Sequence, residues 1–214
     1  MDGGSTDASL EVIRKWEPKL AGWRSSKDKG QAAAINEGIS LGLAPYVCWI
    51  NSDDFLYPEG LAQLLDVMQS QSAAMAYGRC WSVNRKGKKI FPYISMPFSP
   101  RLFANFCFIA QPGTLISRAA WEGADGLNAD MHMAFDYHLW WRLFKSYGEP
   151  VYCRYFVAAT RMHEDTKTAR QIELHYKESR ELVQRHWGRI PMKWRVMLPV
   201  MRLIRKLFSF QSRA

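Results

Sequence analysis

The sequence predicts an α/β protein in which helices cover a largely parallel central sheet. Amphipathic helical patterns alternate with short apolar segments along the chain, and this order is typical of such layered folds. The chain has 214 residues, of which 48% are hydrophobic and 23% charged. This composition suits one good-sized folded domain and excludes disordered or collagen-like proteins. Every apolar run is too short for a membrane-spanning helix.

Each element is predicted from its pattern of apolar residues. Apolar residues at helical spacing, with capping residues, predict helices over residues 6–16, 30–42, 58–68, 135–147 and 168–187. Compact or alternating apolar runs predict strands over residues 22–25, 46–50, 75–83, 89–93, 114–116 and 151–158. The turn 84–87 joins two of these strands in a hairpin. Because ligands of parallel sheets bind beyond the carboxyl ends of the strands, we expect the site in the Asp-rich loops.

Cysteine and charge patterns narrow the class of protein. The four cysteines lie far apart without a Cys-x-x-Cys pair, so we expect reduced thiols in a cytosolic protein. The start of the chain lacks the pattern of a secretory signal. The net charge is +9, but eight basic residues and no acid follow Leu182, which leaves 21 basic against 20 acidic residues elsewhere. A nearly neutral main domain argues against a nucleic-acid partner.

Two neighbouring carboxylates form the first candidate site. Asp53 and Asp54 end the segment 49–54, directly after an apolar strand. Adjacent carboxylates repel each other, and a hard divalent cation relieves that repulsion while bridging to phosphate oxygens. The alternative is a polar turn in which Asp54 caps the next helix.

Two further segments suit a bound anion. In the segment 2–7, two glycines allow close approach of a ligand and hydroxyl groups lead into a helix N-terminus. In the segment 28–38, Lys29 and Gly30 stand at a helix start. Each segment is also explained by an ordinary turn or a loop-to-helix junction.

Taken in order, these motifs resemble those of inverting family 2 glycosyltransferases with the GT-A fold. The resemblance rests on Asp-Gly-Gly-Ser-Thr-Asp, Asp-Lys-Gly-Gln, Ala-Ile-Asn and Asn-Ser-Asp-Asp, which lie between residues 2 and 54. It continues through the segments 111–114, 135–142 and 161–168, and covers roughly residues 1–187. It implies a three-layer GT-A fold and the transfer of a hexose-like sugar from a nucleotide diphospho-sugar to an acceptor hydroxyl. The implied cofactor is Mg²⁺ or Mn²⁺.

The resemblance also implies a role for each matching residue. Asp136 occupies the position of the general base, which removes the proton of the attacking hydroxyl; the alternative is a helix N-cap. Asp54 matches the metal ligand, and His163 could complete the metal shell. Arg161 or Lys167 could neutralise the charge of the departing diphosphate. The candidates for binding the nucleotide sugar are Asp2, Gly4, Lys29, Gly30, Asn36, Asp53, Arg161 and Lys167.

The matching part of the chain starts late in the family pattern. Relatives carry a first strand and a helix before the Asp-Gly-Gly motif, whereas Met1 directly precedes Asp2 here. We therefore expect a GT-A domain over residues 1–190 that lacks its first strand and helix. That absence would leave a strand edge exposed.

The C-terminal residues 191–214 form the second predicted region. Over residues 193–210, apolar residues that include Trp194 share one helical face, and basic residues that include Arg202 and Lys206 lie on a narrow stripe. This is the pattern of a helix that lies on an anionic membrane surface. The alternative is a terminal helix packed on the main domain.

These observations predict a bacterial, cytoplasmic glycosyltransferase at the inner face of the plasma membrane, in cell-envelope polysaccharide synthesis. Its partners would be a nucleotide diphospho-sugar, a saccharide or lipid-linked saccharide acceptor and the anionic membrane, but no nucleic acid. Two other hypotheses stay open: a GT-A-like nucleotidyltransferase, and a non-catalytic fragment that binds nucleotide or lipid.

Overall fold

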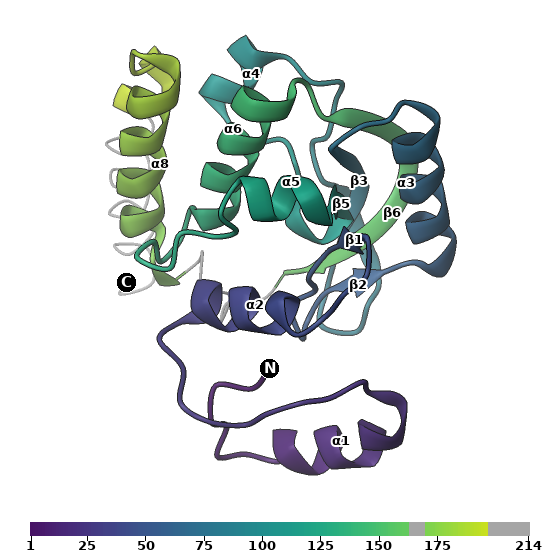
Figure 1. The fold of residues 1–214 in the computed structure, drawn as a ribbon. Coiled ribbons are helices and arrows are strands. Elements are labelled where there is room, and N and C mark those ends of the chain that lie inside the picture. Colours follow the sequence, from purple (N-terminus) through teal and green to yellow (C-terminus); the bar gives the residue numbers. More distant parts are fainter. Residues whose placement is uncertain (163–169, 197–214) are drawn as a thin grey trace.

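The computed structural model describes residues 1–162 and 170–196 (Figure 1). Its centre is a six-stranded sheet with the order β1-β5-β3-β6-β2, and β4 pairs with β3 beside this path. The strands span β1 Tyr46–Val47, β2 Phe55–Leu56, β3 Met75–Val83, β4 Lys89–Pro92, β5 Thr114–Ser117 and β6 Val151–Arg161. The α/β class is confirmed.

The pairing of the strands differs from the prediction. Strands β3 and β6 pair in parallel, but the pairs β1–β5, β5–β3, β3–β4 and β6–β2 are antiparallel. The expected largely parallel sheet is therefore wrong for the described strands, and the sheet is mixed. Antiparallel edge strands on an α/β sheet are common, and single-strand patterns carry no information on pairing direction.

Helices cover both faces of the sheet. Helix α3 (Pro58–Ser70) packs on one face, against β3 and β6, while α4 (Pro100–Asn105), α5 (Arg118–Gly123) and α6 (Phe135–Tyr147) lie on the other (Figure 1). The contact of α3 with β6 is so close that a Cβ at Gly60 would lie 2.3 Å from the carbonyl oxygen of Val157. A glycine is required at that position.

The larger core is aromatic and centres on α6. Trp140 and Trp141 are buried, Trp140 stacks on Trp49 with ring centroids 5.7 Å apart, and Trp141 lies 5.1 Å from Phe103. Helix α8 (Ile172–Trp187) packs on the outer side of α6 (Figure 1). This packing fixes the N-terminal end of α6, where Asp136 lies.

The N-terminal elements lie apart from the sheet. Helix α1 (Ser9–Trp16) has no buried residue and stands away from the rest of the described structure (Figure 1). Helix α2 (Gln31–Ser40), in contrast, packs on the main body and has two buried residues, Ala32 and Ala34. The predicted strand 22–25 is reduced to a single parallel bridge between Asp2 and Ser25. The predicted strand 46–50 keeps only its first two residues as β1.

The beginning of the C-terminal region belongs to the domain. Helical residues 192–196 place Trp194 in the core, where its exposed fraction is 7% and its indole N–H donates to the carbonyl of Ala104 at 2.8 Å. The expectation that Trp194 faces a membrane is therefore wrong, because this ring already has a protein partner. Residues 197–214, with Arg202 and Lys206, lie outside the described part. Within the described part, no helix is long and apolar enough to cross a membrane.

Candidate active site

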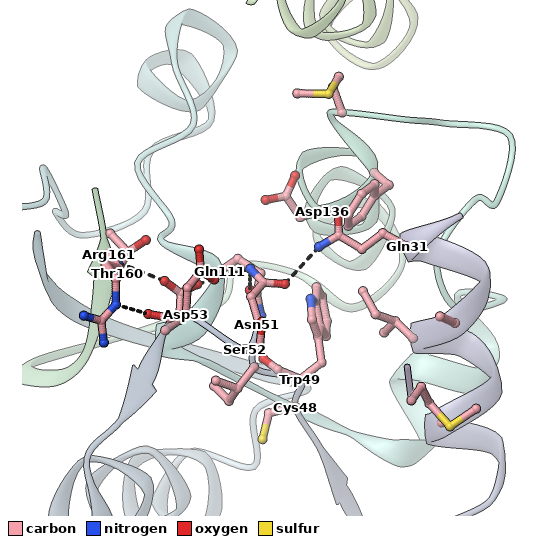
Figure 2. A pocket seen from close by; sticks show the side chains of 18 of the residues that line it. Gln31, Cys48, Trp49, Asn51, Ser52, Asp53, Gln111, Asp136, Thr160 and Arg161 are labelled. Carbon is pink, nitrogen blue, oxygen red and sulfur yellow. Dashed lines mark hydrogen bonds between the residues drawn. The ribbon is translucent and has the colours of Figure 1, made fainter. Parts of the chain in front are cut away.

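The Asp-rich loop lies between two short strands that fix its ends. Strand β1 leads into residues 51–54, and β2, which follows them, pairs with the last residues of β6. This pairing brings the main chain of Arg161 to Asp54, whose Oδ1 accepts its N–H at 3.0 Å. The Nε of Arg161 donates to the carbonyl of Asp53 at 3.0 Å (Figure 2). Residues 107 positions apart in the sequence thereby form one wall.

The Asp54 carboxyl is partly withdrawn from water. Burial raises its pKa, and the neighbouring Asp53 adds to this, while hydrogen bonds from Arg161, Asn51 and Thr160 oppose it. A carboxylate in this position is poorly compensated as an anion. A bound divalent cation would supply the missing compensation.

A set of amide side chains holds the loop in place. Gln31 of α2 donates to Asn51 Oδ1 at 2.9 Å, and Asn51 Nδ2 donates to Asp54 Oδ2 at 3.1 Å (Figure 2). Gln111 donates to the carbonyl of Trp49 at 2.6 Å. Gln31 and Gln111 lie in the sequence motifs, but no role was predicted for them. The hydrogen-bond partners of an amide side chain cannot be identified from sequence.

Asp136 occupies the first turn of α6, on the opposite side of the same space. It is half-buried, and burial raises its pKa to about 6, although the backbone N–H of Tyr137 stabilises the anion from 2.7 Å. A carboxyl with a pKa near neutrality is suited to accept a proton at physiological pH. The bonds at Asp136 do not close an N-cap, so the capping alternative finds no support.

Glu178 of α8 holds the loop that precedes Asp136. Its carboxylate accepts the backbone N–H groups of His132, Met133 and Ala134 at 2.9–3.0 Å. Partial burial opposes ionisation, but these three bonds outweigh it and lower the pKa of Glu178. Sequence reasoning missed this residue, since it lies 42 positions from Asp136 on another helix.

The Asp-rich loop, Arg161 and Asp136 line one cavity of about 1320 Å³. In Figure 2, Asp53 and Arg161 lie on one side, Asn51 lies in the centre, and Asp136 and Gln31 lie on the side away from Arg161. The charged and titratable lining residues are Asp28, Asp53, Asp54, Tyr93, His132, Asp136 and Arg161, together with Cys48. The cavity therefore brings together Asp53, Asp54, Asp136 and Arg161 from the predicted set.

The first motif forms a compact turn beside the cavity. The Asp2 carboxylate accepts the hydroxyl of Ser25 at 2.6 Å and the backbone N–H of Gly4 at 3.0 Å, and bonds from the Ser25 and Ser5 hydroxyls lower its pKa. Gly4 has φ +90°, which explains the need for glycine. Asp2 and Gly4 do not line the cavity, whereas Met1 does.

The second motif lies mostly outside the cavity lining. Lys29 and Gly30 are exposed and lie outside the cavity lining, whereas their neighbour Asp28 lines it. Asn36 also lies outside, and both ends of its amide bond the backbone of Leu127, at 2.8 and 2.9 Å. Asn36 thus joins α2 to the loop after α5, which is a positioning role.

Arg161 does more than face the cavity. Its guanidinium also bonds the carbonyl of Arg85 and lies over the Phe55 ring, 4.8 Å from the centroid. It therefore fixes the Asp-rich loop to the β3–β4 hairpin. The two other predicted cationic or metal-binding residues of this region, His163 and Lys167, lie outside the described residues.

The oxygen donors of the Asp-rich loop fit a hard divalent cation. In residues 1–162 and 170–196, no three His, Cys, Asp or Glu side chains gather into a ready metal cage. Mg²⁺ is commonly held by one or two carboxylates together with substrate phosphates. The partly buried Asp54 and its neighbour Asp53 offer such a pair.

The comparisons with known proteins agree with this geometry. The family model for glycosyl transferase family 2 matches residues 1–120. The chain is 27% identical over 146 residues to chondroitin synthase of Escherichia coli and 29% identical over 144 residues to hyaluronan synthase of Pasteurella multocida. These matches cover 66% and 65% of this chain but only 21% and 15% of the relatives. The chain thus spans a minor part of the curated relatives it matches.

Solved structures show the same fold. The S. aureus TarS 1–349 structure in complex with UDP-GlcNAc superposes with a TM-score of 0.66 at 14% identity, covering 86% of this chain and 55% of that one. A mannosyltransferase from Pyrobaculum calidifontis, in complex with GDP-Man and Mn²⁺, superposes with a TM-score of 0.57 at 14% identity, covering 83% and 53%. The GT-A fold expectation is confirmed. The match of more than half of the sequence to the family model shows that this chain belongs to glycosyl transferase family 2.

Proposed function

We propose that this protein transfers a sugar from a nucleotide diphospho-sugar to an acceptor hydroxyl, with inversion at the anomeric carbon. The observation that carries the proposal is the placement of Asp136, with its pKa of about 6, across one cavity from the Asp53–Asp54 pair. A proton acceptor and a cation-binding pair on opposite walls suit direct displacement, in which the acceptor attacks opposite the departing diphosphate.

The donor would lie against the Asp-rich loop. Asp54 would ligate Mg²⁺ or Mn²⁺ and Asp53 would approach the sugar or ribose, while the metal, when bound, would stabilise the charge on the departing diphosphate. Asp28 lines the same cavity near the predicted nucleotide contacts Asp2, Gly4, Lys29 and Gly30. The solved complexes of TarS with UDP-GlcNAc and of the mannosyltransferase with GDP-Man and Mn²⁺ support the proposal that this protein binds a nucleotide sugar and a metal.

The acceptor hydroxyl would lie at Asp136. The carboxylate would take up the proton of that hydroxyl as the new glycosidic bond forms. Tyr137 N–H would hold one carboxylate oxygen, and Glu178 would keep the preceding loop in place. Trp49 and Phe135 supply apolar parts of the same cavity wall.

We further propose a role in cell-envelope polysaccharide synthesis, on the cytoplasmic side of the membrane. The support is the similarity to chondroitin and hyaluronan synthases and to a protein named for succinoglycan biosynthesis, which is 32% identical over 94 residues. The basic residues of the C-terminal region would hold the protein at an anionic membrane surface.

A binding experiment followed by an activity experiment tests the proposal. The protein is titrated with UDP and with GDP, with and without Mn²⁺, and a panel of nucleotide sugars is then screened for donor hydrolysis. We expect metal-dependent nucleotide binding and hydrolysis of at least one donor, both lost in Asp54→Ala. Release of pyrophosphate from a nucleoside triphosphate would instead indicate a nucleotidyltransferase, and binding without any turnover a non-catalytic protein.

A further inference from the structure

The middle of the chain carries more basic than acidic residues. Between Asp66 and Glu122 the sequence has seven basic residues and no acid. Four of the seven gather at the turn of the β3–β4 hairpin, and all four are exposed: Arg85, Lys86, Lys88 and Lys89. We call these four residues the basic tip.

The basic tip is fixed beside the candidate active site. The guanidinium of Arg161 bonds the carbonyl of Arg85, and its Nε bonds the carbonyl of Asp53 at 3.0 Å. Lys89 is also held, because its ammonium lies over the Trp81 ring, 4.8 Å from the centroid. The hairpin and the Asp-rich loop therefore form one connected wall.

Strand β4 runs from the basic tip along the cavity. Phe91 and Tyr93, which follow the tip, both line the cavity. The Tyr93 hydroxyl donates to the carbonyl of Cys107 at 3.1 Å, and the charge of Asp136 acts on both Tyr93 and Cys107. From Lys89 to Tyr93, one residue past the end of β4, the extended chain covers roughly 13 Å. The strand thus leads from the tip toward the general base.

The charges of the cavity and of the tip have opposite signs. Four carboxyl groups line the cavity, those of Asp28, Asp53, Asp54 and Asp136. A negative group of an acceptor would be repelled near Asp136, whereas the basic tip would attract it. An acidic ligand that spans both regions would therefore place its charge at the tip and a neutral hydroxyl at Asp136.

We propose that the basic tip and β4 form a binding site for an acidic acceptor glycan, whose negative groups lie at the tip while its terminal hydroxyl reaches Asp136. This inference rests on the proposed function and adds the chemical class of the acceptor. Phe91, which is half exposed and lines the cavity, provides a ring against which an intervening sugar can pack. Because the chain from Lys89 to Tyr93 spans roughly 13 Å, which is more than one sugar ring, we expect the site to select oligosaccharides over monosaccharides.

Lysines on an edge strand have another common role, which the experiment must separate. Lys and Pro at an exposed edge prevent strands of different molecules from pairing, and β4 carries Lys89 and Pro92. In that case their loss would cause aggregation and leave glycan binding unchanged.

The experiment compares binding of two glycan series to the full chain in the presence of UDP and Mn²⁺. Oligogalacturonates of increasing length supply the acidic series, and malto-oligosaccharides of equal length supply the neutral one. The test variant combines Lys86→Gln, Lys88→Gln and Lys89→Gln. The control variant removes three exposed charges elsewhere, by Lys15→Gln, Lys177→Gln and Arg180→Gln.

We expect the parent and the control to bind the longer acidic oligomers in a salt-dependent manner, and the test variant to bind them roughly tenfold or more weakly, as expected for several exposed charge pairs. In the parent, the longer acidic oligomers should protect Lys86 and Lys88, but not Lys177, from acetylation. This footprint needs no variant and holds even if the test variant aggregates.

Three results would overturn the inference: equal affinity of the test variant and the control, equal binding of the neutral series, or protection of the tip lysines by phosphatidylglycerol vesicles but not by acidic oligomers. The last result would assign the tip to a membrane surface. None of these readouts needs turnover. The acceptor inference can therefore fail while metal-dependent UDP binding and donor hydrolysis support the proposed function, and it can succeed while that function fails.

Discussion

Asp136→Asn should lower activity and raise stability at the same time. Burial places the pKa of Asp136 at about 6, against an ordinary value of 3.8. One pKa unit corresponds to about 1.4 kcal/mol, so ionising this carboxyl in the folded protein costs about 3 kcal/mol more than in the unfolded chain. Because the side chain is half-buried, water screens part of this cost. The ionised carboxylate therefore lowers the free energy of unfolding by at most about 2–3 kcal/mol.

The sign of the effect depends on pH. Between pH 3.8 and about 6 the folded protein keeps a proton on Asp136 that the unfolded chain has lost, so the stability of the parent falls as pH rises through this window. Above it the parent carries the full cost, whereas the neutral amide of Asn carries none. The variant should therefore melt roughly 4–10 °C higher than the parent at pH 8, and at nearly the same temperature at pH 4.

Activity should move in the opposite direction. Loss of the general base should reduce kcat by about 10² to 10⁴, with unchanged UDP affinity, and the parent's own activity should decline below about pH 6. Melting curves at the two pH values, read beside transfer kinetics, measure both effects. The exposed Asp130→Asn serves as the control. A variant that is less stable at pH 8, or that turns over within a few-fold of the parent, would refute the assignment of Asp136.

Three other changes have definite expected outcomes. Asp54→Ala should abolish the Mn²⁺-dependent part of UDP affinity in calorimetric titration, since a methyl group cannot ligate a hard cation, and an unchanged Mn²⁺ dependence would contradict the metal assignment. Glu178→Gln should cost about 1–2 kcal/mol of unfolding free energy above pH 4.5 and less as pH falls, because protonation removes the same charge from the parent; a pH-independent loss would contradict this. Removal of residues 197–214 should abolish sedimentation with anionic vesicles at low salt and leave the melting temperature unchanged; retained lipid binding would exclude this segment as the membrane contact.

Much of the fold could be predicted from the sequence because its helices and longer strands have clear patterns. The predicted helix 135–147 matches α6 in both bounds, and the hairpin over 75–93 forms as β3 and β4. Strand β2 was missed because two residues form no pattern, and its pairing with β6 is a tertiary contact. That short strand nevertheless brings Arg161 to Asp54.

The candidate site divides in the same way. Asp54 could be named as a candidate because paired carboxylates after a strand suggest a cation site, and Asp136 could be named because its motif resembles that of a known family. The bond of the Asn36 amide to a backbone 91 positions away could not be predicted, because it is a tertiary contact. The expectation that Trp194 faces a membrane was wrong because the sequence shows that a helical face is apolar but not which surface covers it.

The location of charge links the site to its proposed acceptor. The overall charge of the chain suggested a neutral domain with a basic C-terminal region, but a sum over the domain conceals the segment 67–121, which has no acid. Arg161 connects that basic segment to the acidic cavity, since one guanidinium bonds both Asp53 and Arg85. Removing Arg161 should therefore disturb two functions at once, the order of the metal-binding loop and the placement of the basic tip. An enzyme that transfers sugar to an acidic chain needs both: negative groups excluded from the reacting centre, and a positive surface that holds them nearby.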